Sequence, residues 1–147
     1  MTVLKSGALA TALMCTATVS ALAADRAKTA MSCTAPSDLV YECTLEVTNA
    51  RTGAPIEGAK IVLGADMPSM PMVHNMAPVE FQASGTPGQY KAKFPLDMRG
   101  AWAIRLRITG PLRDEVVNVY EFGEADAKLR TGPPPAPAKS KPGHHRH

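Results

Sequence analysis

The sequence lacks the short motifs that mark most nucleophilic, redox and nucleotide-binding enzymes. It contains no Cys-x-x-Cys, no Gly-x-Ser-x-Gly and no glycine-rich loop of the kind that cradles phosphate. Histidine and cysteine are also scarce, with four His and three Cys in 147 residues. Three of these histidines stand at the C-terminal end, which leaves His74 for the remainder of the chain. We therefore expect a protein without enzymatic activity.

Neither sign of charge dominates the part of the chain that we expect to fold. Residues 25–123 carry ten Lys and Arg against eleven Asp and Glu, although the whole chain has a formal charge of +3. Binding to nucleic acid needs a basic stripe on the domain itself. The near-neutral balance therefore argues against nucleic acid as a partner.

Long apolar runs are absent after the first two dozen residues. Residues 6–24 follow the single charge of Lys5, are rich in Ala, Leu and Thr, and end in Ala-Leu-Ala-Ala. This pattern is typical of a cleaved secretory signal. A membrane anchor, the alternative, needs about 20 strongly apolar residues, and Cys15 does not follow the small residue of a lipoprotein site. We predict a signal peptide at residues 1–24 and a periplasmic mature protein without a transmembrane segment.

Two cysteines, Cys33 and Cys43, remain after the predicted cleavage. In an oxidising compartment, a spacing of ten residues favours a disulfide over a shared metal ion. Such a bond closes a short loop and constrains the unfolded chain, which would stabilise the fold by about 2 to 3 kcal/mol.

Apolar and polar residues alternate in short segments with period two, and no helical period is present. Turn signals rich in Gly and Pro separate these segments. The last segment is apolar on both sides, so we expect both of its faces to be covered. The expected strands cover residues 39–48, 59–63, 79–83, 90–94, 102–109 and 116–122.

Six or seven such strands predict an all-β domain, a β-sandwich over residues 25–123. The segment 124–147 differs, because its run of prolines at 133–137 cannot form a strand ladder or bury a core. We predict that residues 124–147 form a disordered tail of polyproline character.

Residues 66–76, which we call the methionine loop, read Asp-Met-Pro-Ser-Met-Pro-Met-Val-His-Asn-Met. The prolines at 68, 71 and 78 exclude a helix and argue against a central strand. In extended chain, alternate residues share one face, and successive members of that face lie about 6.6 Å apart. One ion would therefore take two or three of these side chains, or a curled loop that also brings in Met67. The alternate set is Met70, Met72, His74 and Met76.

Thioether sulfur is a soft, neutral ligand that prefers Cu(I) to hard ions such as Mg²⁺ and Ca²⁺. Imidazole adds a stronger donor that accepts Cu(I) and Cu(II) alike. The loop therefore predicts a copper site, with Cu(I) preferred and Ag(I) as a possible substitute. The alternative is packing, because methionine also fills cores and adaptable surfaces, and Met67 is the first candidate to pack beneath the loop.

Four segments occur in an order that resembles the YtkA-like domain, which is related to FixH-type proteins. They are Arg-Thr-Gly-Ala-Pro-Ile-Glu-Gly-Ala-Lys-Ile at 51–61, the methionine loop, Gly-Gln-Tyr-Lys-Ala at 88–92, and Leu-Asp-Met-Arg-Gly-Ala-Trp at 96–102. The resemblance spans about residues 38–122. It implies an immunoglobulin-like sandwich associated with copper handling, oxidase assembly or heavy-metal efflux. FixH-type proteins usually carry a membrane anchor, which we do not expect here.

By position, the resemblance implies that Met67, Met70, Met72, His74 and Met76 lie on the family's Met-rich loop. Met98 falls in the second motif, next to the strand that carries Trp102. In a sandwich these two segments could meet at one end, where Met98 would complete a site. Packing of Met98 against a core residue Trp102 explains the motif equally well. The tail histidines either bind Cu(II), Ni²⁺ or Zn²⁺ weakly or are simply solvated: His144, His145 and His147.

These features predict a periplasmic carrier or buffer for Cu(I), with a periplasmic or membrane copper protein of oxidase assembly or efflux as its partner. An interaction module without metal is the alternative, in which the methionine loop docks on a membrane or efflux-complex partner. A purely structural sandwich is the third interpretation.

Overall fold

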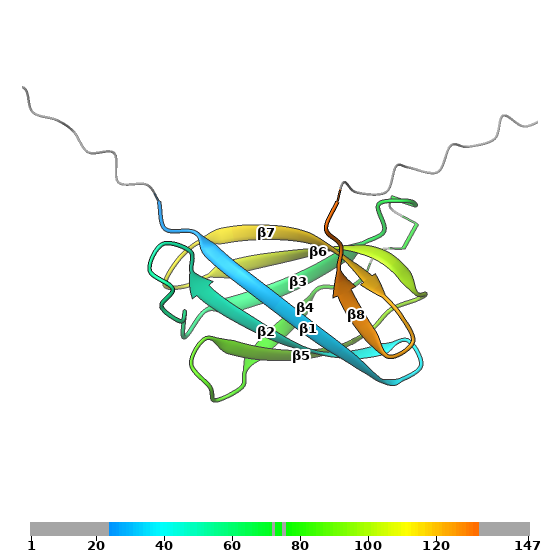
Figure 1. The fold of residues 1–147 in the computed structure, drawn as a ribbon, viewed down its shortest axis with the longest axis horizontal. Coiled ribbons are helices and arrows are strands. Elements are labelled where there is room, and N and C mark those ends of the chain that lie inside the picture. The colour runs from blue at the N-terminus through cyan, green and yellow to red at the C-terminus, as the bar shows by residue number, and fades with distance from the viewer. Residues whose placement is uncertain (1–23, 72, 75, 133–147) are drawn as a thin grey trace, which may run out of the picture.

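The computed structural model describes residues 24–71, 73–74 and 76–132, and this part of the chain contains eight strands and no helix (Figure 1). The all-β class is thereby confirmed. No helix within these ranges is long and apolar enough to cross a membrane. The strands are β1 (Ala27–Ser37), β2 (Val40–Asn49), β3 (Lys60–Asp66), β4 (Val79–Ala83), β5 (Gln89–Pro95), β6 (Gly100–Thr109), β7 (Asp114–Phe122) and β8 (Asp126–Leu129).

The strands form one closed antiparallel barrel in the order β1-β2-β5-β4-β3-β6-β7-β8. Two of its seams are short: β4 meets β5 through two residue pairs, and β8 meets β1 through two. These seams separate three strands, β1, β2 and β5, from the other five. The immunoglobulin-like sandwich of six or seven strands is therefore not confirmed. The alternation of apolar and polar residues specifies which side chains point inward. It does not specify whether the edge strands of two sheets pair and so close a barrel.

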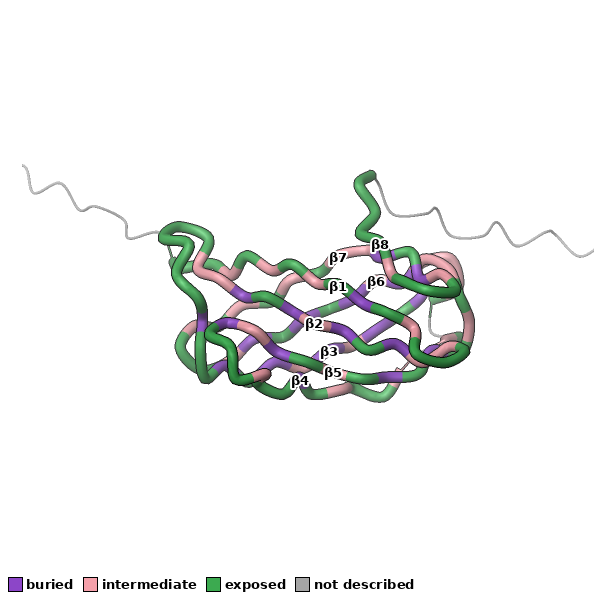
Figure 2. Tube along the Cα trace, turned by 60° about the horizontal axis from the view of Figure 1, so that its bottom comes forward, coloured by how far each residue is buried: buried purple, intermediate pink, exposed green. Residues whose placement is uncertain are grey.

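Buried residues recur at alternate positions along strands such as β2 and β6 (Figure 2), and these buried residues form the barrel core. The predicted inward face of β2 is confirmed, because Tyr41 and Leu45 are fully buried. The same holds for β6, where Trp102 and Ile108 are fully buried. The prediction that both faces of the last strand are covered is wrong, since Val117 is 50% exposed. A barrel covers only the inner face of β7.

Strands β1 and β8 were not among the predicted strands. The half-buried positions of β1 hold mostly small or polar residues such as Ala27 and Thr29, which give a weak alternation signal. The prediction of a disordered tail from residue 124 is wrong for residues 126–129, which form β8. Backbone pairing with β7 and β1 holds this strand, although Ala127 is its one partly buried residue. The proline run and the tail histidines lie outside the described residues.

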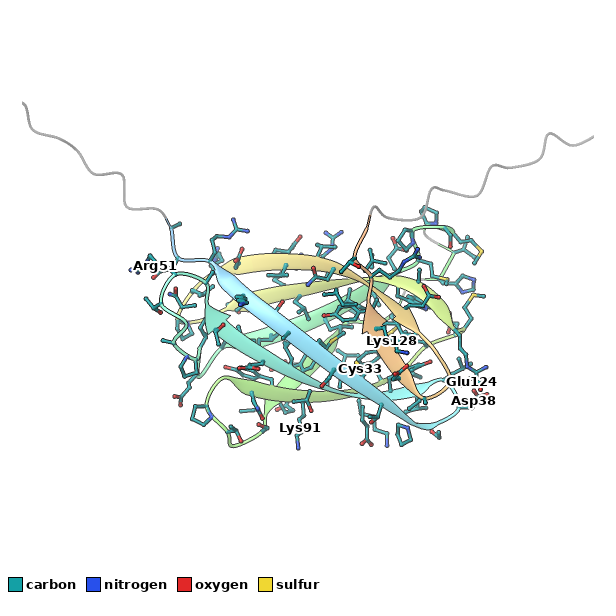
Figure 3. The ribbon with its side chains drawn as sticks, in the orientation of Figure 1. Cys33, Asp38, Arg51, Lys91, Glu124 and Lys128 are labelled. Carbon is teal, nitrogen blue, oxygen red and sulfur yellow. A yellow bond between two sulfur atoms is a disulfide. The ribbon has the colours of Figure 1, made fainter. Side chains whose placement is uncertain are left out.

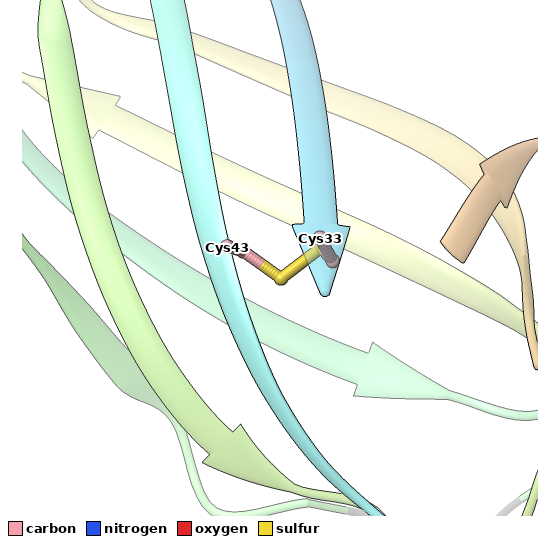
Figure 4. Close-up of a disulfide and its surroundings, with 2 residues drawn as sticks. All are labelled: Cys33 and Cys43. Atoms are coloured by element: carbon pink, nitrogen blue, oxygen red, sulfur yellow. A yellow bond between two sulfur atoms is a disulfide. The ribbon is translucent and has the colours of Figure 1, made fainter. Parts of the chain in front are cut away.

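Cys33 and Cys43 form the predicted disulfide (Figure 4). The two residues lie directly opposite one another on β1 and β2, with 4.1 Å between their Cα atoms and 2.00 Å between their sulfurs. Both are buried, and Cys33 also pairs with Ala127 of β8. The bond therefore lies beside the seam that closes the barrel.

Antiparallel order places four connections at one end of the barrel, which we call the methionine end. They are residues 38–39, 67–78, 96–99 and 123–125, so the β3–β4 loop shares this end with the β1–β2, β5–β6 and β7–β8 turns (Figure 1). Asp38 and Glu124 mark this end in Figure 3, and Arg51 lies at the opposite end.

Candidate functional site

The methionine loop is curled and not extended. The backbone N–H of Met70 donates to the carbonyl oxygen of Met67 at 3.0 Å, and that of Val73 donates to Met70 at 3.2 Å. The N–H of Met76 returns to the carbonyl oxygen of Ala65 in β3 at 3.4 Å. Because the chain returns to Ala65 after eleven residues, side chains that an extended strand would separate lie at one end of the barrel.

The described methionines of this loop turn toward the barrel and not toward solvent. Met67 is 4% exposed and belongs to the core, as the packing alternative anticipated. Met70 and Met76 are partly buried and pack against that core. One of the predicted site residues, Met72, lies outside the described residues, as does Asn75 of the same loop.

The start of β6 is shaped around Met67. A Cβ atom at Gly100 would lie 3.3 Å from the terminal methyl carbon of Met67, which is a tight contact. Gly100 also has a φ of 129°, which L side chains rarely adopt. Glycine at this position therefore lets β6 begin directly over Met67.

Met98 is held at the same end by Trp102. The indole Nε1–H of Trp102 donates to the carbonyl oxygen of Met98 at 3.1 Å. Trp102 is fully buried, which confirms it as a core residue, and Met98 is partly buried against the core. The turn that carries Met98 is thereby fixed to the barrel.

The methionine loop and the β5–β6 turn meet through the side chains of His74 and Asp97. Nδ1 of His74 lies 3.3 Å from Oδ2 of Asp97, and the rings of His74 and Trp102 approach edge to face with their centroids 6.4 Å apart. The His74 side chain is 25% exposed. Sequence reasoning missed Asp97, although its place beside Met98 in the Asp-Met dipeptide was a usable signal.

Cross-links between connections brace the rest of the methionine end. Arg99 forms an ion pair with Asp38 of the β1–β2 turn. The Tyr41 hydroxyl donates to the carbonyl oxygen of Gly123 in the β7–β8 turn at 2.6 Å. Burial raises the pKa of Tyr41, and the nearby Arg99 offsets part of that increase. The first contact links the β5–β6 turn to the β1–β2 turn, and the second links β2 to the β7–β8 turn.

The chemical character of this end is that of a soft donor set. Within the described ranges, no group of three or more His, Cys, Asp and Glu side chains is arranged to hold a metal ion. The donors gathered here are instead one imidazole and several thioethers, a set whose chemistry fits Cu(I) or Ag(I). The described members are His74, Met67, Met70, Met76 and Met98.

Val73 is the apolar tip of the methionine loop. Its side chain is 69% exposed, more than any other large hydrophobic residue among those the structure describes. Such a tip beside partly buried methionines also suits contact with another protein.

A comparison with known protein families identifies a match for the part of the chain that carries the candidate site. The family model described as YtkA-like matches residues 34–107, from the end of β1 into β6. The matched segment contains the methionine loop, the β5–β6 turn and Trp102. No curated protein and no solved structure matches the chain.

Proposed function

Since this chain belongs to the YtkA-like family, we propose that it is a copper-binding protein that holds Cu(I) at the methionine end of its barrel. The observation that carries the proposal is the meeting of the methionine loop with the β5–β6 turn at His74 and Asp97. Both of these connections carry methionines, so the thioethers of Met70, Met76 and Met98 belong to the same end of the barrel as the imidazole. Met70, Met76, Met98 and His74 would hold the ion, together with Met72, and Met67 would support them from the core.

The character of the donors supports Cu(I) over other ions. Thioethers need no deprotonation and carry no charge, so they bind a soft monovalent cation without competing for protons. The methionines pack against an apolar core, which limits access of water to one side of the ion. A partly exposed His74 leaves the other side open, so a second protein could displace the ligands one at a time. These features suit carriage, buffering or delivery.

The proposed compartment is the periplasm. The signal-like residues 1–24 support it, and so does the Cys33–Cys43 disulfide, because such bonds persist in oxidising compartments. We also propose that the barrel is an immunoglobulin-like sandwich closed at its two short seams. A membrane or periplasmic copper protein would be the recipient or donor of the ion.

The test is a titration of the protein from residue 25 onward with Cu(I), without oxygen and against a competing chelator. Ascorbate should keep the copper reduced, because a thiol reductant would also attack the disulfide. Trp102 gives a second readout, since it is the single tryptophan and its ring lies 6.4 Å from that of His74. We expect stoichiometric binding with a change in tryptophan fluorescence.

The matched variant replaces Met70, Met72 and Met76 by leucine. Leucine keeps the apolar volume within the small cost typical of Leu–Met exchange, so the fold should survive while the thioethers are lost. Binding that disappears in this variant supports the proposal. Equal Cu(I) binding by the wild type and the variant, or none by the wild type, would refute it.

The alternative is a module that docks on a protein partner through the methionine loop without metal. The exposure of Val73 favours this interpretation. The same leucine variant separates the two functions, because an apolar docking surface should survive the exchange and a copper site should not. Replacing Val73 by serine should have the opposite effect: docking is lost and Cu(I) binding is kept.

A further inference from the structure

His74 and Asp97 connect the methionine loop to the β5–β6 turn by their side chains. Nδ1 of His74 and Oδ2 of Asp97 are 3.3 Å apart. The histidine side chain is 25% exposed and the aspartate side chain 68% exposed. A mostly covered imidazole is therefore held by a carboxylate that reaches it from the solvent side.

The chemistry of the two groups sets the direction of this hydrogen bond. An ionised carboxylate can only accept hydrogen bonds, so Nδ1 of His74 must carry the proton. A neutral imidazole has one protonated nitrogen, which leaves Nε2 with a free lone pair. Metal ions bind the unprotonated nitrogen.

We propose that Asp97 is a positioning residue for metal binding, because it holds His74 in the Nδ1–H tautomer and so presents Nε2 as the ligand. This inference rests on the proposed Cu(I) site. A carboxylate that accepts from the second nitrogen of a ligating histidine fixes the tautomer and ring orientation and makes the ligand more basic. Asp97 would thus prepare His74 before any ion arrives.

Trp102 restricts the same ring from inside the barrel. The two ring planes meet at 71°, with their centroids 6.4 Å apart. Trp102 is itself fixed by its hydrogen bond to Met98, so the imidazole contacts a buried indole as well as the carboxylate of Asp97. The β5–β6 turn would then supply both a ligand, Met98, and the group that orients another ligand, His74.

The first test needs no metal. Long-range nitrogen–proton NMR correlations report which ring nitrogen of a neutral histidine carries the proton, and a His74→Gln variant identifies the His74 signals. At mildly alkaline pH we expect the Nδ1–H form in the wild type and a shift toward Nε2–H in Asp97→Ala. Asp97→Asn should keep the Nδ1–H form, because its amide oxygen still accepts a hydrogen bond. An unchanged tautomer in Asp97→Ala would overturn the proposal.

The second test measures Cu(I) affinity of the same proteins. Loss of the orienting group should weaken binding by about 10- to 100-fold in Asp97→Ala, and Asp97→Asn should recover most of it. Both variants lack the negative charge of Asp97. The difference in Cu(I) affinity between them therefore reports the hydrogen bond to His74 and not a general electrostatic effect. Glu57→Ala, an exposed site in the β2–β3 connection at the opposite end, removes the same charge and should leave affinity unchanged.

The outcomes separate this inference from the proposed function. A wild type that binds Cu(I), with Asp97→Ala binding equally well, would overturn the positioning role and leave the copper site intact. If His74 of the wild-type protein is in the Nδ1–H form but the protein binds no Cu(I), the proposed function is overturned. Any role of Asp97 toward the metal is then overturned with it. A tautomer shift accompanied by weaker binding, with both reversed in Asp97→Asn, supports the proposal.

Discussion

The indole N–H of Trp102 donates a hydrogen bond to the carbonyl oxygen of Met98, 3.1 Å away. This bond joins a fully buried core residue of β6 to the turn that carries a proposed ligand. It also satisfies the one polar atom of a buried indole, which would be costly to leave unpaired. The core and the candidate site therefore share a structural support.

Replacing Trp102 by phenylalanine should weaken both the fold and the site. The lost hydrogen bond alone should lower the free energy of unfolding by about 1 to 3 kcal/mol, and the freed turn should lower Cu(I) affinity. Urea unfolding followed by far-UV circular dichroism measures the first effect. Met98→Leu is the control, because it keeps the backbone carbonyl and should change stability little. A Trp102→Phe protein as stable as the wild type would show that the hydrogen bond contributes nothing.

The second prediction concerns Asp114 at the opposite end of the barrel. Its Oδ2 accepts from the backbone N–H of Ala27 at 2.8 Å and from Nε of Arg26 at 3.1 Å, and its Oδ1 accepts from Glu115 at 2.9 Å. Burial raises the pKa of Asp114, but these hydrogen bonds and the charge of Arg26 outweigh it, so the pKa is below its usual value. Asp114 thus fastens the start of β1 to the start of β7.

A depressed pKa in the folded state means that Asp114 stabilises the fold fully above the usual value of 3.8. That contribution is lost as the pH falls through the folded-state pKa. Asp114→Asn should therefore lower the free energy of unfolding by about 1 to 2 kcal/mol at neutral pH. The difference from the wild type should shrink as the pH falls to about 3. Denaturant unfolding at both pH values measures this, and a pH-independent difference would contradict it. Glu57→Gln, an exposed substitution, should show no difference at either pH.

The inward faces of the barrel could be predicted from the sequence, because burial follows period two wherever the inward residues are large. Tyr41 and Trp102 are examples, and both are fully buried. Strand β1 escaped prediction because most of its inward positions hold small or polar residues, with Met31 as the large exception. Strand β8 escaped prediction because backbone pairing with β7 and β1 holds it, and not an apolar face. Closure of the barrel is a tertiary property that no local pattern encodes.

The candidate site, too, could be predicted only in part from the sequence. Composition alone identified the methionine loop, since soft side chains between prolines are unusual. The contact of His74 with Asp97 could not be predicted, because it depends on where the β5–β6 turn lies relative to the curled loop. Whether Met67 would be buried was equally open, because methionine serves as ligand and as core filler.

The third prediction uses two glycines with similar backbones. A Cβ at Gly88 would lie 2.8 Å from Cβ of Pro55 and 2.9 Å from the carbonyl oxygen of Val47, whereas a Cβ at Gly53 would meet nothing within 4 Å. Their φ angles are 71° and 73°. Both substitutions to alanine incur the conformational cost of a positive φ, about 1 kcal/mol. Gly88→Ala should cost about 1 to 3 kcal/mol more, because backbone must move. Thermal and urea unfolding of the two variants would reveal the difference, and equal losses would contradict it.

The fourth prediction separates the core methionine from the ligand methionine. Met67 is 4% exposed and lies beneath Gly100, whereas Met98 is partly buried on a turn beside His74 and Asp97. Leucine at either position should keep the fold, at a cost below about 1.5 kcal/mol. Met98→Leu should lower Cu(I) affinity by at least about tenfold. Loss of a residue that only orients a ligand already has an effect of this size, and Met98 is itself a proposed ligand. Met67→Leu should leave affinity nearly unchanged, since its thioether serves packing. Chelator competition on both variants measures this, and a larger loss for Met67→Leu would place the ion deeper in the barrel than the β5–β6 turn.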